Sequence, residues 1–314
     1  MSKENTLDEH LLIQKYFSDI GSAYLAERNV ELSVGDDAAI LNLNPDTQYI
    51  NSIDTSIEDI HFLSFISPRD IAYRSCAIAL SDLAACGANP SWYSIALTFP
   101  KADHLWLDDF STGLNDFSDE YKIPLVGGDT TKGKLTVTVQ VMGEVKKGKA
   151  LLRSGAKEND LIYVSGVIGD AFLQLKELKK SQNQDTGFDA YLNPKAQIEL
   201  GLELVDIASS AIDISDGLIQ DLNLVCKSSD VGADVHLSMI PTSVENKTLE
   251  LINSGDDYQI CFTASEDKSA KVNNISERLG VPITEIGKIT NTRELTLFDH
   301  EGNKMDLESG YSHF

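Results

Sequence analysis

The chain has 314 residues, of which 49 are acidic and 26 basic, so its formal net charge at pH 7 is −23. A surface this acidic repels nucleic acid and anionic membranes, and we expect neither as a partner. Hydrophobic residues make up 42% and charged residues 24%, which is typical of a globular protein, and the length predicts two domains of about 150 residues each.

The cysteines and the N-terminus bear on the cellular compartment. Cys76, Cys86, Cys226 and Cys261 show no CxxC spacing, so neither a zinc site nor a redox pair is predicted. Four cysteines in such a chain are typical of small buried groups in a reducing compartment. The sequence shows no basic segment followed by an apolar run at its start, and no apolar stretch of about 18 residues. We therefore predict a cytoplasmic protein.

Hydrophobic periodicity predicts alternating helices and strands in the first half of the chain. In chain order these are a helix over 7–28, a strand over 48–54, a helix over 68–87, a strand over 91–99, a helix over 103–121, a short strand over 125–126 and a strand over 135–145. The last is the clearest, because Val137, Val139 and Val141 alternate with polar residues, as in a half-buried strand.

The second half of the chain shows a similar mixture. A lysine- and glycine-rich stretch follows residue 145 and predicts a domain boundary near 149, giving domains 1–149 and 150–314. Beyond it we predict a strand over 161–165, a helix from 170, a loop over 180–190, a helix over 198–209, a strand over 211–214 followed by a helix, and strands over 257–263 and 293–298. The predicted fold class is α/β, or α+β, with two domains of similar size.

Five short segments each present aspartate in a small-residue setting that we interpret as a turn. They are residues 34–39, 52–55, 80–85, 126–131 and 213–217. Glycine lets a backbone approach a phosphate closely, and aspartate offers the hard oxygen ligands that Mg²⁺ prefers. If the segments converge, their carboxylates repel one another unless more than one cation neutralises them.

Each segment alone is explained equally well by ordinary local structure. Aspartate at a helix start is usually an N-cap, and Asp-Gly is usually a turn. The set is more informative, above all Asp82, which lies in the apolar run IALSDLAACGA, where an unpaired carboxylate is costly to bury. The sequence contains no P-loop, no protein-kinase motif set and no GxSxG, and Gly166 to Gly169 form only a partial dinucleotide fingerprint.

Three further residues are candidates for binding substrate. Arg153 carries a guanidinium, the natural clamp for phosphate oxygens, but it is equally well an arginine on a surface linker. His61 lies near Asp54 and is otherwise a histidine packed beside Phe62. Asp256 lies in a Gly-Asp-Asp-Tyr run that also reads as a turn into a strand.

The motifs GDDAAI, SIDTS, IHF, LSDLAACGANP, VGGDTT, LRSGA, DISDGL and SGDDYQICF occur in this order. In these motifs the chain resembles the bacterial thiamine-monophosphate kinases, from about residue 10 to the C-terminal GYSHF. The wider superfamily includes aminoimidazole ribonucleotide synthetase, selenophosphate synthetase and a hydrogenase maturation factor. The resemblance implies two α/β domains, a homodimer paired through the N-terminal sheet, and ATP bound across the domains with several Mg²⁺ ions.

The resemblance also implies roles for individual residues. The implied Mg²⁺ ligands are Asp37, Ser52, Asp54, Asp82, Asp129, Asp213 and Asp216. The implied ATP contacts are Tyr121, Gly128, Asp129, Arg153 and Ser215, and the implied substrate contacts are His61, Asp256 and Tyr311. Two positions depart from the family pattern: Asp256 stands where the family usually has Glu, and no Trp precedes Gly310-Tyr311, so Tyr311 or Phe314 would supply the surface that stacks on the thiamine ring.

The expected reaction is ATP-dependent phosphorylation of thiamine monophosphate to thiamine diphosphate by in-line transfer. A phosphate monoester has a second pKa near 6, so the acceptor is already an anion at neutral pH and we assign no general base. Two alternatives stay open: another ATP-dependent synthetase of the superfamily, or a non-catalytic protein that binds nucleotide and metal. The first Cys is Cys76 and the chain ends Ser312-His313-Phe314, so the terminal cysteines expected of selenophosphate synthetase and the maturation factor are missing.

Overall fold

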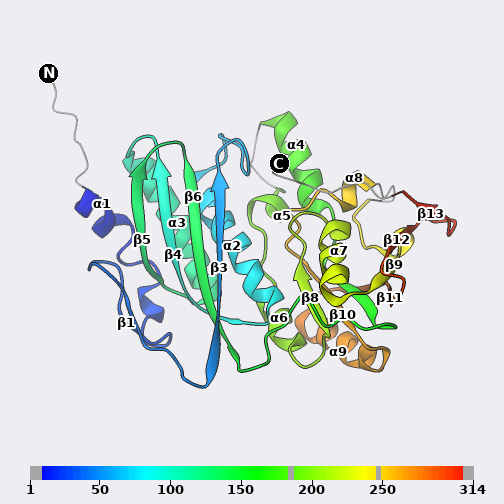
Figure 1. Cartoon of the computed structure of the whole chain (residues 1–314). Helices are drawn as coiled ribbons and strands as arrows, with labels where there is room; N and C mark the ends of the chain where they lie inside the picture. Colours follow the sequence, from blue (N-terminus) through cyan, green and yellow to red (C-terminus); the bar gives the residue numbers. More distant parts are fainter. Residues whose placement is uncertain (1–8, 183–186, 245–248, 307–314) are drawn as a thin grey trace. The chain divides into compact units, whose positions relative to one another are not determined.

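The computed structural model describes residues 9–182, 187–244 and 249–306. Contacts divide the chain into two compact units (Figure 1). Unit 1 comprises Met1–Leu83 and Asn89–Lys146, and unit 2 comprises Ala84–Ala88 and Lys147–Phe314. Within the three described ranges, every helix is too short or too polar to cross a lipid bilayer.

Unit 1 is built around a four-stranded sheet with the order β3-β6-β4-β5, in which β4 and β5 are parallel and the other pairs antiparallel. Its elements are α1 (Glu9–Tyr16), β1 (Val30–Leu32), β2 (Ile40–Leu41), β3 (Thr47–Ile57), α2 (Pro68–Ala85), β4 (Asn89–Phe99), α3 (His104–Tyr121), β5 (Leu125–Lys132) and β6 (Thr136–Lys146). Strands β1 and β2 form a separate two-stranded sheet.

The two faces of this sheet have different surroundings. Val137, Val139 and Val141 of β6 are fully buried, whereas Thr138 between them is only half-buried and shares a hydroxyl–hydroxyl hydrogen bond of 2.9 Å with Thr55 of β3. Helices α2 and α3 lie over the valine face (Figure 1). The alternation in the sequence therefore separates a face covered by helices from a face that the helices leave uncovered, where β1 and β2 pack around Trp92 and Met142.

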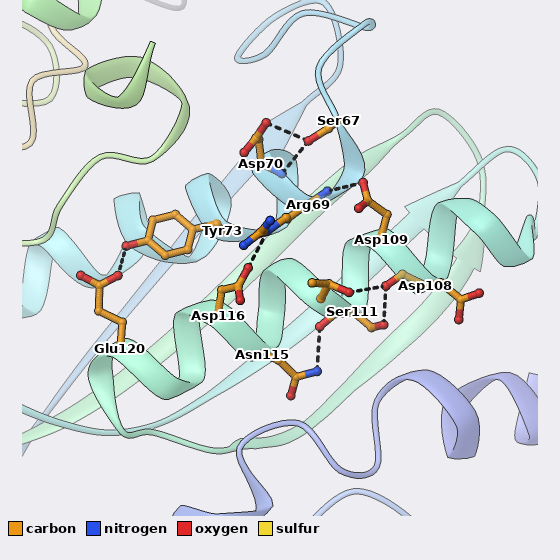
Figure 2. A network of polar contacts seen from close by, with 11 residues as sticks. Ser67, Arg69, Asp70, Tyr73, Asp108, Asp109, Ser111, Asn115, Asp116 and Glu120 are labelled. Carbon is orange, nitrogen blue, oxygen red and sulfur yellow. Dashed lines mark hydrogen bonds and ion pairs between the residues drawn. The ribbon is translucent and has the colours of Figure 1, made fainter. Parts of the chain in front are cut away.

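Helices α2 and α3 lie side by side and are joined by polar contacts at their surface (Figure 2). The Arg69 Nε donates to Asp116 Oδ2 at 2.6 Å, and the Tyr73 hydroxyl donates to Glu120. Below these contacts the helices approach closely at Gly113, where an added Cβ would lie 2.1 Å from the Arg69 carbonyl oxygen. Glycine at this position lets the two backbones touch.

We expect Gly113→Ala to lower the free energy of unfolding by about 2 kcal/mol, because the new methyl group must push the two helices apart. The change works against helix propensity, which favours Ala over Gly by about 1 kcal/mol. Urea denaturation of both proteins measures the difference. Asn115→Ala, two residues along on the exposed side of α3, is the matched control and should be neutral or stabilising. A Gly113→Ala protein as stable as the parent would contradict the close approach.

Unit 2 contains a seven-stranded sheet with the order β13-β12-β9-β11-β7-β10-β8, whose pairs are antiparallel except for β12 with β9. Its strands are β7 (Leu161–Ser165), β8 (Ser210–Asp213), β9 (Gly232–His236), β10 (Ile260–Ala264), β11 (Ile283–Thr290), β12 (Leu295–Phe298) and β13 (Lys304–Met305). Its helices are α4 (Asp170–Ser181), α5 (Asp189–Leu192), α6 (Ile198–Leu204), α7 (Leu218–Ser229), α8 (Leu249–Ile252) and α9 (Ser269–Leu279).

The core of unit 2 explains why its strands are nearly continuous apolar runs. Ile162 and Val164 of β7 and Cys261 of β10 belong to one buried cluster, into which α7 inserts Leu218 and Leu222. Strands in the middle of a sheet that is covered on both faces bury residues of both parities. The short runs LIYVS and ICFTA therefore form interior strands.

Several predicted boundaries change in the structure. The helix predicted over 7–28 ends at Tyr16, and a short 3-10 helix follows at Ser22–Tyr24. Gly21 stands between them at φ 65°, and a Cβ there would lie 2.7 Å from the Pro124 Cα. The helix predicted over 198–209 ends at Leu204, and the strand predicted over 257–263 begins at Ile260.

Two of the aspartate segments interpreted as turns prove to be strand interior, and a third is helical. Asp54 lies within β3 and Asp129 within β5, while Asp82 lies in the last turn of α2. Small residues suggested turns, but Gly128 has another use, because a Cβ there would lie 1.9 Å from the Ile95 carbonyl oxygen of β4. Glycine permits close strand approach as well as turning.

Candidate active site

Two aspartates and a serine form a polar group in unit 1. Ser52 and Asp54 are two residues apart in β3 and therefore point to the same face of the sheet. Asp54 pairs with Val139, whose side chain is fully buried, so this is the face covered by α2. Asp82 of α2 meets them there, and the Ser52 hydroxyl donates a hydrogen bond to Asp82 Oδ2.

The two carboxylates affect one another electrostatically. Burial, and to a smaller extent the negative charge of Asp82, raise the pKa of Asp54 to about 6. Both causes disfavour the ionised form of Asp54, so at neutral pH the pair holds two negative charges at an energetic cost. A bound divalent cation would remove that cost. Such repulsion is expected between carboxylates that serve as metal ligands.

Asp129 lies on the opposite face of the same sheet. Across the sheet, Asp129 pairs with Ala96, Ala96 with Thr138, and Thr138 with Thr55. All four side chains are exposed or half-buried. Strands β3 and β5 are the two edges of the sheet, three strand spacings apart, or roughly 14 Å at about 4.8 Å each. Within unit 1 the structure brings Ser52, Asp54 and Asp82 together but does not bring Asp129 to them.

The remaining candidates of unit 1 have separate surroundings. Asp37 is exposed in the segment between β1 and β2. His61 follows β3, and its Nδ1 accepts a hydrogen bond of 3.0 Å from the Ile57 backbone N–H, so the neutral ring carries its proton on Nε2. Tyr121 ends α3 half-buried and interacts with Tyr73, whose pKa is raised by burial and then by Tyr121.

In unit 2, β8 ends at Asp213 and delivers the turn Ser215–Gly217 that precedes α7. Asp213 is 4% exposed, Asp216 is half-buried and Ser215 is exposed. Asp216 Oδ2 accepts a hydrogen bond of 3.3 Å from Gln220 Nε2 in the first turn of α7. The predicted strand, turn and helix are all observed, and the turn presents a hydroxyl and a carboxylate.

A second segment of unit 2 lies directly against this turn. The Asp256 N–H donates to the Ser215 carbonyl oxygen at 2.9 Å, and the Tyr258 N–H donates to the Ile214 carbonyl oxygen at 2.8 Å. The Tyr258 hydroxyl donates to Asp256 Oδ1 at 2.9 Å. The structure therefore joins the predicted nucleotide contact Ser215 and the predicted substrate contact Asp256 through the backbone.

Asp257, next in the chain, is a buried carboxyl that the sequence did not single out. Its Oδ1 accepts a hydrogen bond of 2.8 Å from the Gly169 N–H at the start of α4, while Oδ2 has no partner among the described residues. Burial raises the pKa of Asp257 to about 8. This carboxyl occupies the start of α4, which explains the partial glycine fingerprint before that helix without any bound dinucleotide.

We expect the stability of the protein to fall between about pH 4 and pH 8 through Asp257, because the folded state keeps this carboxyl protonated after the unfolded chain has lost the proton. Asp257→Asn mimics the neutral acid and should remove that fall. At about 1.4 kcal/mol per pKa unit, the variant should be more stable at pH 9 by a few kcal/mol and equally stable at pH 4. Denaturant titrations at both pH values test this, and equal stability at pH 9 would contradict it.

The two remaining predicted residues are Arg153 and Tyr311. Arg153 is exposed in the segment that precedes β7. Tyr311 lies outside the described residues, as do Gly310 and Phe314. The stacking surface expected for a thiamine ring therefore stays a prediction.

The oxygen ligands of unit 1 fit Mg²⁺ in number and kind. Among the described residues, no three His, Cys, Asp or Glu side chains gather into a group that could hold a metal ion. Mg²⁺ is usually held by one or two carboxylates, with water and substrate phosphates completing the shell. Asp54 and Asp82 with the Ser52 hydroxyl supply such a partial set.

Asp221 is a second buried carboxyl of this region that the sequence did not single out. It lies in the first turn of α7, is 2% exposed, and its Oδ2 accepts hydrogen bonds from the backbone of the 215–217 turn. Burial raises its pKa to about 6, although those hydrogen bonds oppose the rise. An acidic residue within the first turn of a predicted helix was the available signal, since carboxylates are favoured there.

Comparison with known protein families agrees with this architecture. The N-terminal domain of AIR synthase related proteins matches residues 35–145, and the C-terminal domain of the same class matches residues 137–300. The fold and its carboxylate-bearing segments therefore define a two-domain protein of the AIR synthase related class. Its curated relatives include thiamine-monophosphate kinase of Escherichia coli O157:H7, at 41% identity over 98% of both chains. The chain belongs to the thiamine-monophosphate kinase family.

Solved structures extend the match to three dimensions. Thiamine-monophosphate kinase from Stenotrophomonas maltophilia K279a superposes with a TM-score of 0.84 at 34% identity, covering 91% of this chain and 96% of that one. The structure of AaThiL complexed with AMPPCP and TMP gives a TM-score of 0.75 at 25% identity, covering 93% and 95%. The two-domain fold predicted from the sequence is confirmed.

Proposed function

We propose that this protein transfers the γ-phosphoryl group of ATP to the phosphate of thiamine monophosphate, forming thiamine diphosphate in the biosynthesis of that cofactor. The observation that carries the proposal is the half-buried Ser52–Asp54–Asp82 group in a chain that matches thiamine-monophosphate kinases over 98% of its length. The structure of AaThiL complexed with AMPPCP and TMP supports both substrates.

The acceptor needs no general base, because the phosphate oxygen of the monoester is largely ionised at neutral pH. The main difficulty is to hold two polyanions together in a protein of net charge −23. Asp54, Asp82 and the Ser52 hydroxyl would hold Mg²⁺, which supplies charge neutralisation and alignment to the transferring phosphoryl group. The Ser52 hydroxyl donates to Asp82 Oδ2 and so would help to hold that carboxylate in place.

The same proposal gives roles to the two domains and to the other predicted residues. Residues 1–149 would form the ATP- and Mg²⁺-binding and dimerisation domain, and residues 150–314 the second α/β domain. Asp37, Asp129, Asp213 and Asp216 remain proposed ligands of additional Mg²⁺ ions; Tyr121, Gly128, Asp129, Arg153 and Ser215 remain proposed ATP contacts; His61, Asp256 and Tyr311 remain proposed thiamine monophosphate contacts.

A homodimer is proposed through the uncovered face of the unit 1 sheet. Ile53 on this face is 61% exposed, and Thr55 and Ala96 beside it are exposed as well. An apolar and small-residue sheet face of this kind is suited to a second copy of the chain. Light scattering coupled to size exclusion tests the dimer. We propose a cytoplasmic location because the four cysteines, each in a described range, form no disulfide with one another.

One assay decides between the proposed function and its alternatives. Purified protein is incubated with ATP, MgCl₂ and thiamine monophosphate, and thiamine diphosphate is measured by chromatography. Product that depends on all three components supports the kinase. Free phosphate without thiamine diphosphate would favour another synthetase of the class, and nucleotide binding without turnover would favour a non-catalytic binding protein.

A further inference from the structure

The carboxylate of Asp221 turns back from α7 onto the turn that precedes the helix. One oxygen, Oδ2, accepts three consecutive backbone N–H groups, from Ser215 at 3.0 Å, Asp216 at 3.1 Å and Gly217 at 3.2 Å. The side chain is 2% exposed, so water does not compete for these bonds. Hydrogen bonds to an ionised acceptor are about twice as strong as neutral ones.

Three consecutive N–H groups directed at one atom fix the path of the backbone through the turn. The directions of the Ser215 and Asp216 side chains follow from that path. Gly217 completes the turn at φ 126°, where a Cβ would lie 2.6 Å from the Asn253 carbonyl oxygen. The turn is therefore held by hydrogen bonds to Asp221 and by close packing of Gly217 against the Asn253 backbone.

The same turn sets the position of the neighbouring segment. The Ser215 carbonyl oxygen accepts the Asp256 N–H at 2.9 Å, and a Cβ on Gly255 would lie 2.1 Å from that oxygen. The two backbones are thus in direct contact, and a shift of Ser215 must be passed on to Asp256. This coupling runs through the backbone alone.

We propose that Asp221 is a positioning residue that sets the proposed ATP contact Ser215, the proposed Mg²⁺ ligand Asp216 and, through the Ser215 carbonyl, the proposed substrate contact Asp256. This assignment rests on the proposed function. Asp221 contacts neither substrate and acts through the turn it holds. Loss of the Asp221 carboxylate is therefore expected to lower kcat/KM for ATP and for thiamine monophosphate, although Ser215 is a proposed contact of ATP alone and Asp256 of thiamine monophosphate alone.

The test compares Asp221→Leu, which removes the acceptor, with Asp221→Asn, which keeps an uncharged acceptor oxygen. We expect Asp221→Leu to lower kcat/KM by about 100-fold for ATP and for thiamine monophosphate alike, since a displacement of about 1 Å can cost that much. Asp221→Asn should lie between it and the parent. Amide hydrogen exchange, followed by mass spectrometry, should speed up at residues 215–217 in the same order.

Asp299→Leu is the matched control. Asp299 Oδ1 also accepts two backbone N–H groups, from Glu301 and Asn303, in a hairpin of the same unit that carries none of the proposed site residues. It should leave the kinetic constants unchanged. If Asp221→Leu does not fold, Asp221→Asn decides: unaltered exchange at 215–217, or unaltered kinetic constants, would overturn the proposal.

Failure of the proposed function gives a different result. The parent protein would then form no thiamine diphosphate, whereas the exchange measurement and the calorimetric affinity for AMPPCP need no turnover and still report whether Asp221 holds the turn. An unchanged AMPPCP affinity in a folded Asp221→Leu protein would overturn the nucleotide-side half of the proposal.

Discussion

Replacing Asp54 with Asn is expected to lower turnover by at least about 100-fold while making the metal-free protein more stable, since removing one group that stabilises transferring charge typically costs that much in rate. The gain in stability follows from burial and the Asp82 charge, which raise the pKa of Asp54 to about 6. A rise of about two pKa units at about 1.4 kcal/mol each corresponds to a gain in the free energy of unfolding of about 3 kcal/mol at pH 7.5.

The stability difference between the Asn variant and the parent depends on pH and on Mg²⁺. The unfavourable charge exists only where Asp54 is ionised, so the advantage of the Asn variant should appear as pH rises from about 4 to above 6 and should be absent at pH 4. Added MgCl₂ should raise the Tm of the parent by mass action and leave the Tm of the variant almost unchanged.

Thermal denaturation of parent and variant, with EDTA or with MgCl₂ and at pH 4 and pH 7.5, measures the stability difference and the Mg²⁺-dependent rise in Tm. Asp109→Asn is the control, because Asp109 is also half-buried in unit 1 but only accepts the Arg69 backbone N–H, on the α2–α3 surface (Figure 2). Its Mg²⁺ response should match the parent. An Asp54→Asn protein that keeps the full Mg²⁺-dependent rise in Tm would refute the metal role of Asp54.

Periodicity predicted the elements of the fold well where one physical cause dominates. The β6 strand shows strict alternation and was predicted within one residue at each end. Helix α3 has an aspartate N-cap at Asp103, which accepts N–H groups from Leu105 and Trp106, and its start was also predicted within one residue. The helix over 7–28 failed because Gly21 must contact Pro124 closely, a tertiary requirement that no local pattern reveals.

The site was harder to predict, because small residues have more than one use. Glycines before Asp129 suggested a phosphate-binding turn, yet Gly128 lets β5 approach β4 within a continuous strand. Strand membership then decided which face each carboxylate occupies. The parity that places Ser52 and Asp54 toward Asp82 depends on the register of β3 with β6, which the sequence alone did not supply.

Asp129 provides the second large effect, and its position makes the prediction demanding. It is exposed on the face of the sheet opposite Asp54 and, within one copy of unit 1, three strands away. Asp129→Asn should nevertheless lower turnover by about 100-fold or more if the residue contacts Mg²⁺ or nucleotide phosphate, because a neutral amide is a far weaker ligand. Its stability should be unchanged, since an exposed substitution typically costs less than about 0.5 kcal/mol.

Steady-state assays over a range of MgCl₂ concentrations separate two outcomes for Asp129→Asn. A ligand of Mg²⁺ shows a loss that rising MgCl₂ partly restores, and Asp108→Asn, an exposed α3 carboxylate 3.8 Å from Lys15, should show no loss. Normal turnover in Asp129→Asn would remove Asp129 from the proposed Mg²⁺ ligands and ATP contacts. A large loss would instead require substrates or a second copy of the chain to reach the uncovered face, because the register of the sheet keeps the two carboxylates of one copy apart.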